Sequence, residues 1–241
     1  MTALTVQVAV ADEDGYIRLG TDESGFSGGD LEQFVTNAKV VIGQHTDSGL
    51  GGSYNPDVYT GWIHLKNLTI AQGATINNAK LHFYHNANNG FGTGTDPDEG
   101  FTVAAQDTDD ASKPTQYSHI TGWTLTSATV ATGSLINAGG MSAESFNNAW
   151  YPTHASAGAG LEIKTILQEL VNRSGWSSGS NMNIKLTPAS YNGVDWDVRW
   201  TDYDTTTSLA MKLVIDYTAA AAAAVAAPDL PGAAFLMFVD N

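Results

Sequence analysis

The side chains that most often carry catalysis occur in this chain, but their spacing assembles no familiar reaction site. General acid–base hydrolysis needs two carboxylates that face each other, about 5 to 10 Å apart. Glu162 and Glu169 share one face of a predicted helix and point the same way, so we expect solvated charges. The glycine- and serine-rich run 24–29 follows no apolar strand, as a serine nucleophile would require. We therefore expect no enzymatic activity.

Two sets of side chains have the chemistry to bind a metal ion. Three histidines lie on predicted strands: His64, His82 and His85. Because His82 and His85 are three positions apart, they fall on opposite faces of a strand, which argues against a shared metal. Asp107, Asp109 and Asp110 offer the oxygen ligands that calcium prefers, although their spacing is not that of an EF-hand. We expect a solvated loop there and no cofactor, with a structural calcium ion as the alternative.

Aromatic side chains in predicted loops are the third group with binding chemistry, because exposed rings can form a platform for sugars. Most of these rings we expect to close the ends of the domain, above all Trp176 after the predicted helix. One loop combines an Asn-Gly turn with aromatic and acidic neighbours. Its candidate glycan contacts, with a tryptophan that follows, are Tyr191, Asp195, Trp196 and Trp200.

Short β-strands must position all of these groups. Residues 61–86 hold two β-like runs, and the second alternates, with Leu81, Phe83 and His85 on one face and polar or mixed residues on the other. Between the runs, Gly73 and the pair Asn77-Asn78 supply turn chemistry. We expect these runs to build a sandwich.

The same alternation recurs along the chain, and one helix interrupts it. Further predicted strands lie at residues 4–10, 40–42, 101–105 and 209–217. In residues 161–172 apolar side chains recur at three-and-four spacing, which predicts a helix that buries its stripe across one end of the sandwich. These patterns predict an all-β fold, a jelly-roll β-sandwich with one short helix capping an end. We expect one domain over 1–218, followed by an alanine-rich linker and apolar arm over 219–241.

Four segments together resemble a known family. They are GATINNAKLHFY, LEIKTILQELVNRSGWSSGSNMNIKL, VRWTDYD and LAMKLVIDY, and they are similar to the β-sandwich modules called DNRLRE or disaggregatase-related domains. The resemblance covers roughly residues 55 to 218 and rests on hydrophobic pattern and a few turn residues. It implies a jelly-roll fold similar to that of carbohydrate-binding modules, and such modules often hold a structural calcium ion. They occur in surface proteins, polysaccharide-acting proteins and phage particles.

The composition of the chain limits the classes of partner that it can bind. The chain carries 25 acidic and 10 basic residues, a net charge of −15, so its surface repels nucleic-acid phosphate and anionic lipid headgroups. We expect neither nucleic acid nor membrane as a partner. The absence of cysteine excludes disulfides and cysteine-bound metals.

The two ends of the sequence favour a particle protein. The start has no basic region and no long apolar run, so we expect no signal peptide. The end contains an apolar cluster that we expect to dock on a neighbouring subunit: Pro231, Phe235, Leu236, Met237, Phe238 and Val239. We expect a bacteriophage virion protein, a capsid decoration protein or a fibre or tail component, whose partners are its own copies and capsid or tail proteins. The alternative is a carbohydrate-binding or adhesive surface module that contacts host-surface glycans.

Overall fold

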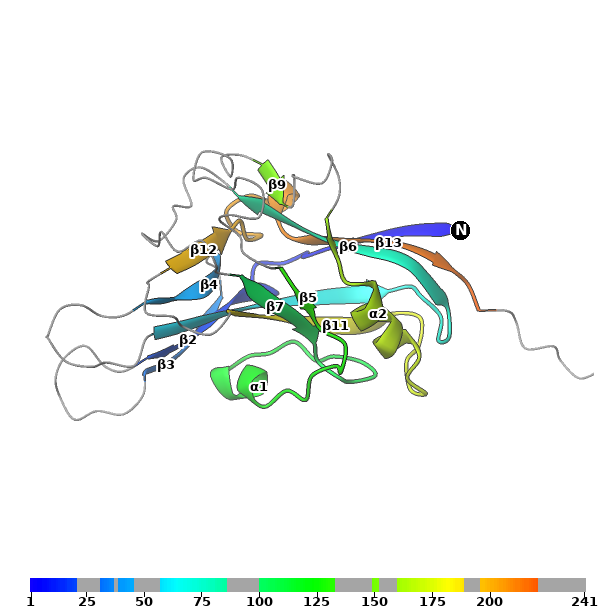
Figure 1. The fold of residues 1–241 in the computed structure, drawn as a ribbon, viewed down its shortest axis with the longest axis horizontal. Coiled ribbons are helices and arrows are strands. Elements are labelled where there is room, and N and C mark those ends of the chain that lie inside the picture. Colours follow the sequence, from blue (N-terminus) through cyan, green and yellow to red (C-terminus); the bar gives the residue numbers. More distant parts are fainter. Residues whose placement is uncertain are drawn as a thin grey trace, which may run out of the picture.

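The computed structural model describes residues 1–20, 31–36, 39–45, 57–85, 100–132, 149–151, 160–188 and 196–220. Within these ranges the chain folds into antiparallel β-sheets arranged as two facing layers, with short helices at the periphery (Figure 1). The predicted all-β class is therefore confirmed. No helix of the described residues is long and apolar enough to cross a membrane.

One layer is a five-stranded sheet in the order β1-β13-β6-β10, with β9 also paired to β6. Its strands are β1 (Thr2–Gln7), β6 (Thr75–His85), β9 (Ala149–Tyr151), β10 (Leu161–Glu162) and β13 (Lys212–Thr218). The first and last of these strands are direct neighbours, with Thr2 opposite Tyr217 and Gln7 opposite Lys212.

The other layer is an eight-stranded sheet built around the long strand β5 (Asp57–Leu68). The remaining strands are β2 (Asp14–Gly20), β3 (Leu31–Thr36), β4 (Val40–His45), β7 (Phe101–Ala105), β8 (Val130–Ala131), β11 (Ser180–Pro188) and β12 (Trp196–Trp200). Strand β5 pairs with β2, β4 and β11. Strand β4 pairs only with the start of β5, at residues 57–59, and β11 pairs with residues 61–68. The sheet therefore divides into two branches, which pair with successive segments of β5.

The chain passes from one layer to the other between β5 and β6. Ile70 and Ala74 in this connection are fully buried, and Gly73 adopts a φ of +71°, which a side chain would disfavour. Asn77 and Asn78 do not form a turn. They lie within β6, where their side-chain amides donate to Thr218 Oγ1 and Asp216 Oδ2 of β13.

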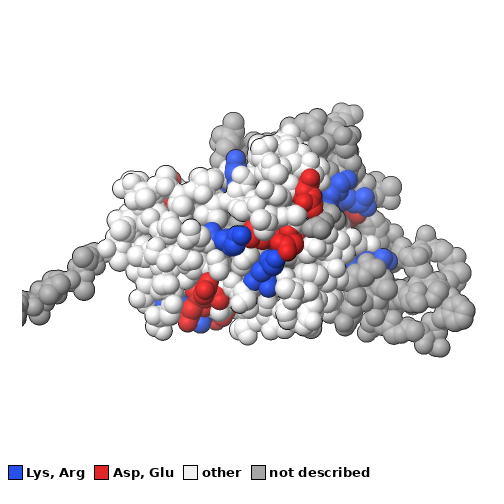
Figure 2. Space-filling model, turned by 180° about the vertical axis from the view of Figure 1, so that it is seen from behind, with Lys and Arg blue, Asp and Glu red and all other residues white. Residues whose placement is uncertain are grey.

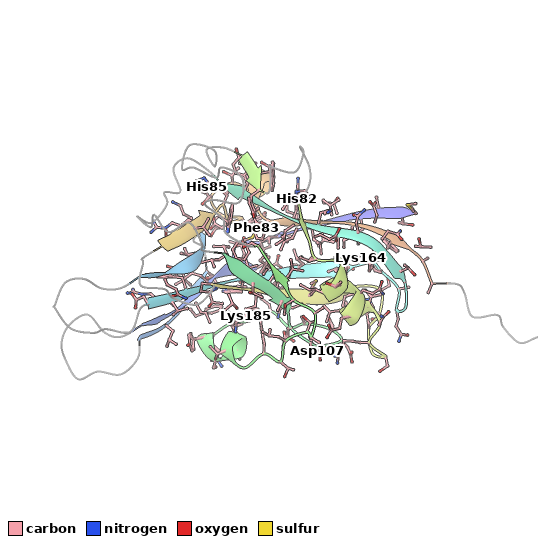
Figure 3. All side chains as sticks on the ribbon, viewed as in Figure 1. His82, Phe83, His85, Asp107, Lys164 and Lys185 are labelled. Carbon is pink, nitrogen blue, oxygen red and sulfur yellow. The ribbon has the colours of Figure 1, made fainter. Side chains whose placement is uncertain are left out.

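The main core fills the space between the layers. Leu81 and Phe83 of β6 lie in this core together with Ile63 and Leu65 of β5, and all four are fully buried. Figure 3 shows Phe83 directed towards the space between the sheets and His82 on the other side of its strand. The predicted alternation of this strand is confirmed.

The predicted helix is α2 (Lys164–Val171), and it closes one end of the sandwich against β6 and β7 (Figure 1). Its buried stripe is Ile166, Leu167, Leu170 and Val171. The first two residues predicted as helix form strand β10 instead, because Leu161 pairs with Leu81 of β6. Trp176 after the helix is buried as expected, and its Nε1–H donates to Ile70 O at 2.9 Å.

A second helix was missed by the sequence prediction. The five-residue α1 (Tyr117–Thr121) covers the outer face of the eight-stranded sheet. Its Ile120 packs with Ile17 and Trp62 in a small second core, where Phe34 stacks on Trp62 at 5.3 Å between ring centroids. Five residues are too few to show a helical period in the sequence. A short 3-10 helix, η2 (Thr207–Leu209), precedes β13.

Candidate functional site

Most residues of the two predicted binding surfaces lie outside the described part of the chain. These are the glycan-contact candidates Tyr191 and Asp195, and the subunit-docking candidates Pro231, Phe235, Leu236, Met237, Phe238 and Val239. Trp196 is described only as the first residue of β12. The predicted roles of all these residues stay predictions.

Trp200 does not fit the predicted role of a glycan contact. Its side chain is 0% exposed, because it lies on the face of β12 that is turned into the core. The ring packs against Phe83 at 5.1 Å and Tyr151 at 5.3 Å between centroids. Trp200 therefore stabilises the sandwich and cannot stack on a sugar at the surface.

The acidic loop considered for calcium contacts an arginine. Arg173 Nε donates to Asp109 Oδ1 at 2.7 Å, and its Nη1 contacts Asp107 Oδ1. Asp110 accepts the backbone N–H of Asn181 at 2.8 Å. Across the described ranges, no group of three acidic, histidine or cysteine side chains converges as a metal site. The three carboxylates thus hold the segment after α2 against the loop that follows β7.

Glu162 and Glu169 are not the free solvated charges that the sequence led us to expect. Glu162 Oε1 accepts the backbone N–H of Ala79 at 2.8 Å and of Lys164 at 3.0 Å, so it supports the first turn of α2. The two Glu169 oxygens accept the N–H groups of Ser127 and Ala128, both at 2.7 Å. Each carboxylate thus accepts hydrogen bonds from two backbone N–H groups, which is a structural role.

The three histidines do not form a shared site either. His64 Nδ1 lies 2.6 Å from Asn183 Oδ1 within the eight-stranded sheet, whereas His82 and His85 belong to β6 of the other layer. Burial lowers the pKa of His64 and of His82, and Lys212 and Lys80 lower that of His82 further. Both imidazoles are therefore neutral at pH 7.

The strongest candidate site is a groove at the start of β5. One register row crosses four strands here: Arg18 of β2 pairs with Tyr59 of β5, which pairs with Gly43 of β4, which pairs with Asp197 of β12. Paired residues share a face of an antiparallel sheet. Because Gly43 has no side chain, space is left between Tyr59 and Asp197.

This groove has a volume of about 440 Å³, of the size that holds a small ligand. Its described lining residues are Tyr16, Lys39, Val41, Tyr59, Asp197, Arg199 and Thr205. They come from strands that are far apart in sequence, with Thr205 contributed by the segment after β12. Only strand pairing brings them together.

One ion pair fixes polar groups of the groove, and a second lies beside it. Arg199 Nε and Nη2 donate to Asp197 Oδ2 at 2.9 and 2.7 Å, and the Asp197 carboxylate itself is 2% exposed. On the other side of Tyr59, Arg18 Nε donates to Asp57 Oδ2 at 2.9 Å. Asp57 can sit there only because the neighbouring strand has a glycine, since a Cβ at Gly20 would lie 1.6 Å from Asp57 Oδ1.

The aromatic part of the groove is a tyrosine pair. The rings of Tyr16 and Tyr59 are 5.8 Å apart and tilted by 52°, and the Arg18 guanidinium lies 5.7 Å from the centre of the Tyr59 ring. Burial raises the pKa of Tyr59, so its phenol stays protonated and can donate a hydrogen bond at neutral pH. Half-buried rings beside fixed donors and acceptors suit a neutral ligand rich in hydroxyl groups.

The charged side chains among the described lining residues are Lys39, Asp197 and Arg199. Asp197 is the one carboxylate among the described groove residues, and Arg199 occupies it. A second carboxylate positioned across the groove, as acid–base hydrolysis requires, is not among these lining residues. Seen from behind, charges of both signs lie in small groups separated by uncharged surface (Figure 2).

No protein-family model matches the sequence, and no curated protein matches it either. The family resemblance drawn from four segments of the sequence therefore stays a prediction.

The groove residues were not predicted from the sequence, although part of the signal was present. GYIRL and DVYTG both alternate, which places Tyr16 with Arg18, and Asp57 with Tyr59, on one face of their strands. What the sequence lacks is the register that aligns these strands with Gly43 and Asp197. That alignment is a property of the folded sheet.

Proposed function

We propose that this chain is a non-catalytic recognition module with a jelly-roll sandwich, and that its groove binds a carbohydrate. The observation that carries the proposal is the row of Arg18, Tyr59, Gly43 and Asp197. This row places an aromatic ring and an open space between two charged side chains that are held by ion pairs. Sugars present apolar C–H faces and a rim of hydroxyl groups. The tyrosine pair supplies apolar area for the faces, and the lining residues Lys39, Arg199 and Thr205 supply hydrogen-bonding groups for the hydroxyls.

The fixed geometry of the groove supports binding further. Side chains that are already held by partners lose little rotamer freedom when a ligand arrives, so more of the contact energy appears as affinity. Arg199 is held by Asp197, and Arg18 by Asp57. The groove is thus prepared for a ligand before it binds.

The test is a glycan-binding screen with purified protein, followed by titration of the best ligand against variants. Tyr59→Ala and Tyr16→Ala should each weaken binding about tenfold, because one lost ring contact is worth about 1.4 kcal/mol. Tyr84→Ala is the matched control, since Tyr84 is a half-buried tyrosine of the other sheet that packs on Trp150. Equal losses in Tyr59→Ala and Tyr84→Ala would show that stability, and not the groove, governs binding.

We also propose that the module works as a structural subunit of a bacteriophage particle. The supporting observation is the apolar cluster at residues 235–239, which follows two prolines in an acidic, cysteine-free chain. Among the described residues, large apolar side chains at the surface are few and scattered: Met1, Val10 and Leu19. A strong hydrophobic contact with other copies or with capsid or tail proteins therefore falls to the C-terminal arm in this proposal.

Deletion of residues 228–241 tests the second proposal. The truncated protein should keep its β-rich circular dichroism spectrum and lose self-association in sedimentation, as well as incorporation into particles. Full occupancy of particles by the truncated protein would contradict it. The two proposals are compatible, because an outer subunit of a phage particle can contact host-surface glycans through its groove.

A further inference from the structure

The first strand of the five-stranded sheet has an open edge. Strand β1 pairs with β13 on one side, and no other strand of the described residues lies along its second side (Figure 1). The backbone N–H of Val8 donates to Met211 O at 3.1 Å, in the register of the β1–β13 pair. Hydrogen-bonded pairs recur at every second residue of an antiparallel ladder, so the even-numbered residues of β1 direct their backbone groups to β13. The odd-numbered residues direct theirs to the open edge, and these are Ala3, Thr5 and Gln7.

The fold covers the next position of this edge but not these three. The backbone N–H of Ala9 donates to Glu13 Oε2 at 3.0 Å. Within the described ranges no such partner meets the backbone groups of Ala3, Thr5 and Gln7. Their N–H and C=O groups are therefore available to another strand.

Strand β1 also lacks the features that protect edges. Natural proteins usually prevent edge pairing with charged residues, proline, bulges or very short strands. Of the other edge strands that the structure describes, β3 contains Glu32, β12 contains Asp197 and Arg199, and β8, β9 and β10 have only two or three residues. The six residues of β1, TALTVQ, include no charge and no proline, and they pair with β13 without a bulge. Such an edge suits the addition of a strand.

We infer that β1 pairs with β1 of a second copy of the chain, antiparallel about a two-fold axis at Thr5. In this register Thr5 lies opposite Thr5 of the second copy, and Ala3 lies opposite its Gln7. All three odd-numbered residues are then used. Because each hydrogen-bonded pair exchanges two bonds, the contact contains about six, within the range of about 5 to 15 of a typical interface.

The side chains of β1 fit the same register. On the inner face, Leu4 is only partly buried against the core, and it would lie opposite Val6 of the second copy. The pairing would thus extend the apolar core of each sandwich. On the outer face, Thr5 meets Thr5, a combination that is favourable across antiparallel strands.

The charges beside β1 favour a second copy as the partner. In β13, Asp216 lies opposite Ala3 and Lys212 lies opposite Gln7. Because Ala3 of one copy meets Gln7 of the other, each row across the interface has an acidic residue at one end and a basic residue at the other. The net charge of −15 repels two copies at long range, and this edge adds no like charges in contact.

This contact rests on the proposal that copies of the chain assemble, and it adds a second surface to the one given to the C-terminal arm. It would join the five-stranded sheets of two copies into one continuous sheet. Backbone pairing buries little apolar area, so we expect it to be weak when the arm is deleted.

The test traps the register with cysteines, which the chain lacks. Thr5→Cys in the full chain places two thiols at the two-fold axis, where the Cα atoms of a hydrogen-bonded pair lie about 5.5 Å apart and a disulfide can form. Ala3→Cys is the register control, because the two copies of this position lie about 14 Å apart along the paired strands. Under a mild oxidant we expect a disulfide-linked dimer of Thr5→Cys and none of Ala3→Cys. Absence of the Thr5→Cys dimer, or equal yields from both variants, would overturn the inference.

Two further variants of the full chain test the edge without a cross-link. Thr5→Pro removes an N–H that makes no bond within the subunit, so the circular dichroism spectrum should stay and self-association in sedimentation should weaken at least about tenfold. Thr5→Lys covers the case in which the proline variant does not fold, since it sets two lysines opposite each other and should weaken association in the same way. Thr69→Lys is its control, with the same charge change at an exposed residue of the β5–β6 connection. Association of Thr5→Lys as tight as that of Thr69→Lys would contradict the pairing.

Hydrogen exchange separates this inference from the role of the arm. In assembled wild type the amides of Ala3, Thr5 and Gln7 should exchange more slowly than in dilute protein, whereas those of Leu4 and Val6 should be slow in both. Assembly that depends on residues 228–241 but leaves the three odd-numbered amides fast would support the arm and refute the edge. Cross-linking of Thr5→Cys in a protein that assembles equally well without residues 228–241 would support the edge and refute the arm.

Discussion

Replacing Leu170 by aspartate tests how α2 holds the end of the sandwich. Leu170 is 1% exposed in the middle of the buried stripe of the helix. Removing a buried leucine side chain alone costs about 2–5 kcal/mol. The new carboxyl group must in addition stay neutral in an apolar site, which at pH 7 costs about 4 kcal/mol for a shift of three pH units.

The sum of these two costs, about 6–9 kcal/mol, is comparable to the total stability of a domain, about 5–15 kcal/mol. The chain can reduce the cost by releasing α2 from the sandwich. It then gives up the burial of Ile166, Leu167 and Val171, and the bonds of Gln168 to Ile76 N at 2.8 Å and Ala74 O at 3.0 Å. Either way, we expect Leu170→Asp to lower the free energy of unfolding by at least about 4 kcal/mol.

Urea unfolding monitored by tryptophan fluorescence and circular dichroism measures this loss. Leu170→Ala should fall between wild type and Leu170→Asp, because it creates the cavity without the charge. Thr165→Asp is the control: it adds the same charge to an exposed position in the first turn of α2, where the helix dipole favours it. A midpoint for Leu170→Asp within error of the Thr165→Asp midpoint would refute the packing of this stripe.

Three further predictions concern polar contacts. Glu169→Ala should lower stability by about 1–2 kcal/mol in urea unfolding, since it removes the acceptors of Ser127 N and Ala128 N, whereas Glu169→Gln should lower it less. Arg173→Gln should cost only about 0.5–1 kcal/mol, an effect that shrinks in high salt, because Arg173, Asp107 and Asp109 are all partly exposed; a loss above about 2 kcal/mol would contradict this. Burial holds the pKa of His82 below its ordinary value, so the unfolded chain binds more protons below about pH 6.5, and stability should fall as the pH drops from there. His82→Gln should flatten this fall in melting temperature between pH 7 and 5, and an unchanged profile would count against the buried neutral imidazole.

The parts of the fold that could be predicted from the sequence are those with a local period. The alternation in β6 indicated which of its faces is buried, and the stripe of α2 indicated its helix. The start of the helix could not be predicted in this way, because pairing with Leu81 of β6 decides whether Leu161 belongs to a helix or to a strand.

The candidate site depends on contacts that no local pattern records. Trp200 follows a loop in the sequence, yet its strand turns the ring onto Phe83 in the core. Glu169 looks like a surface charge on a helix, and only the fold brings two backbone N–H groups to it. In the groove, Tyr59 and Asp197 are more than a hundred residues apart and meet through Gly43.

The pairing of β1 with β13 decides how the domain responds to a mechanical pull. Thr2 lies opposite Tyr217, so a force applied to residues 2 and 218 acts on the same end of the two strands. Antiparallel strands loaded in this way separate by peeling, one hydrogen-bonded pair after another, instead of sliding past each other with all bonds loaded together. The five-stranded sheet would then open at low force, starting beside α2 and the β5–β6 connection, and the groove at the start of β5 would be among the last parts to feel the load.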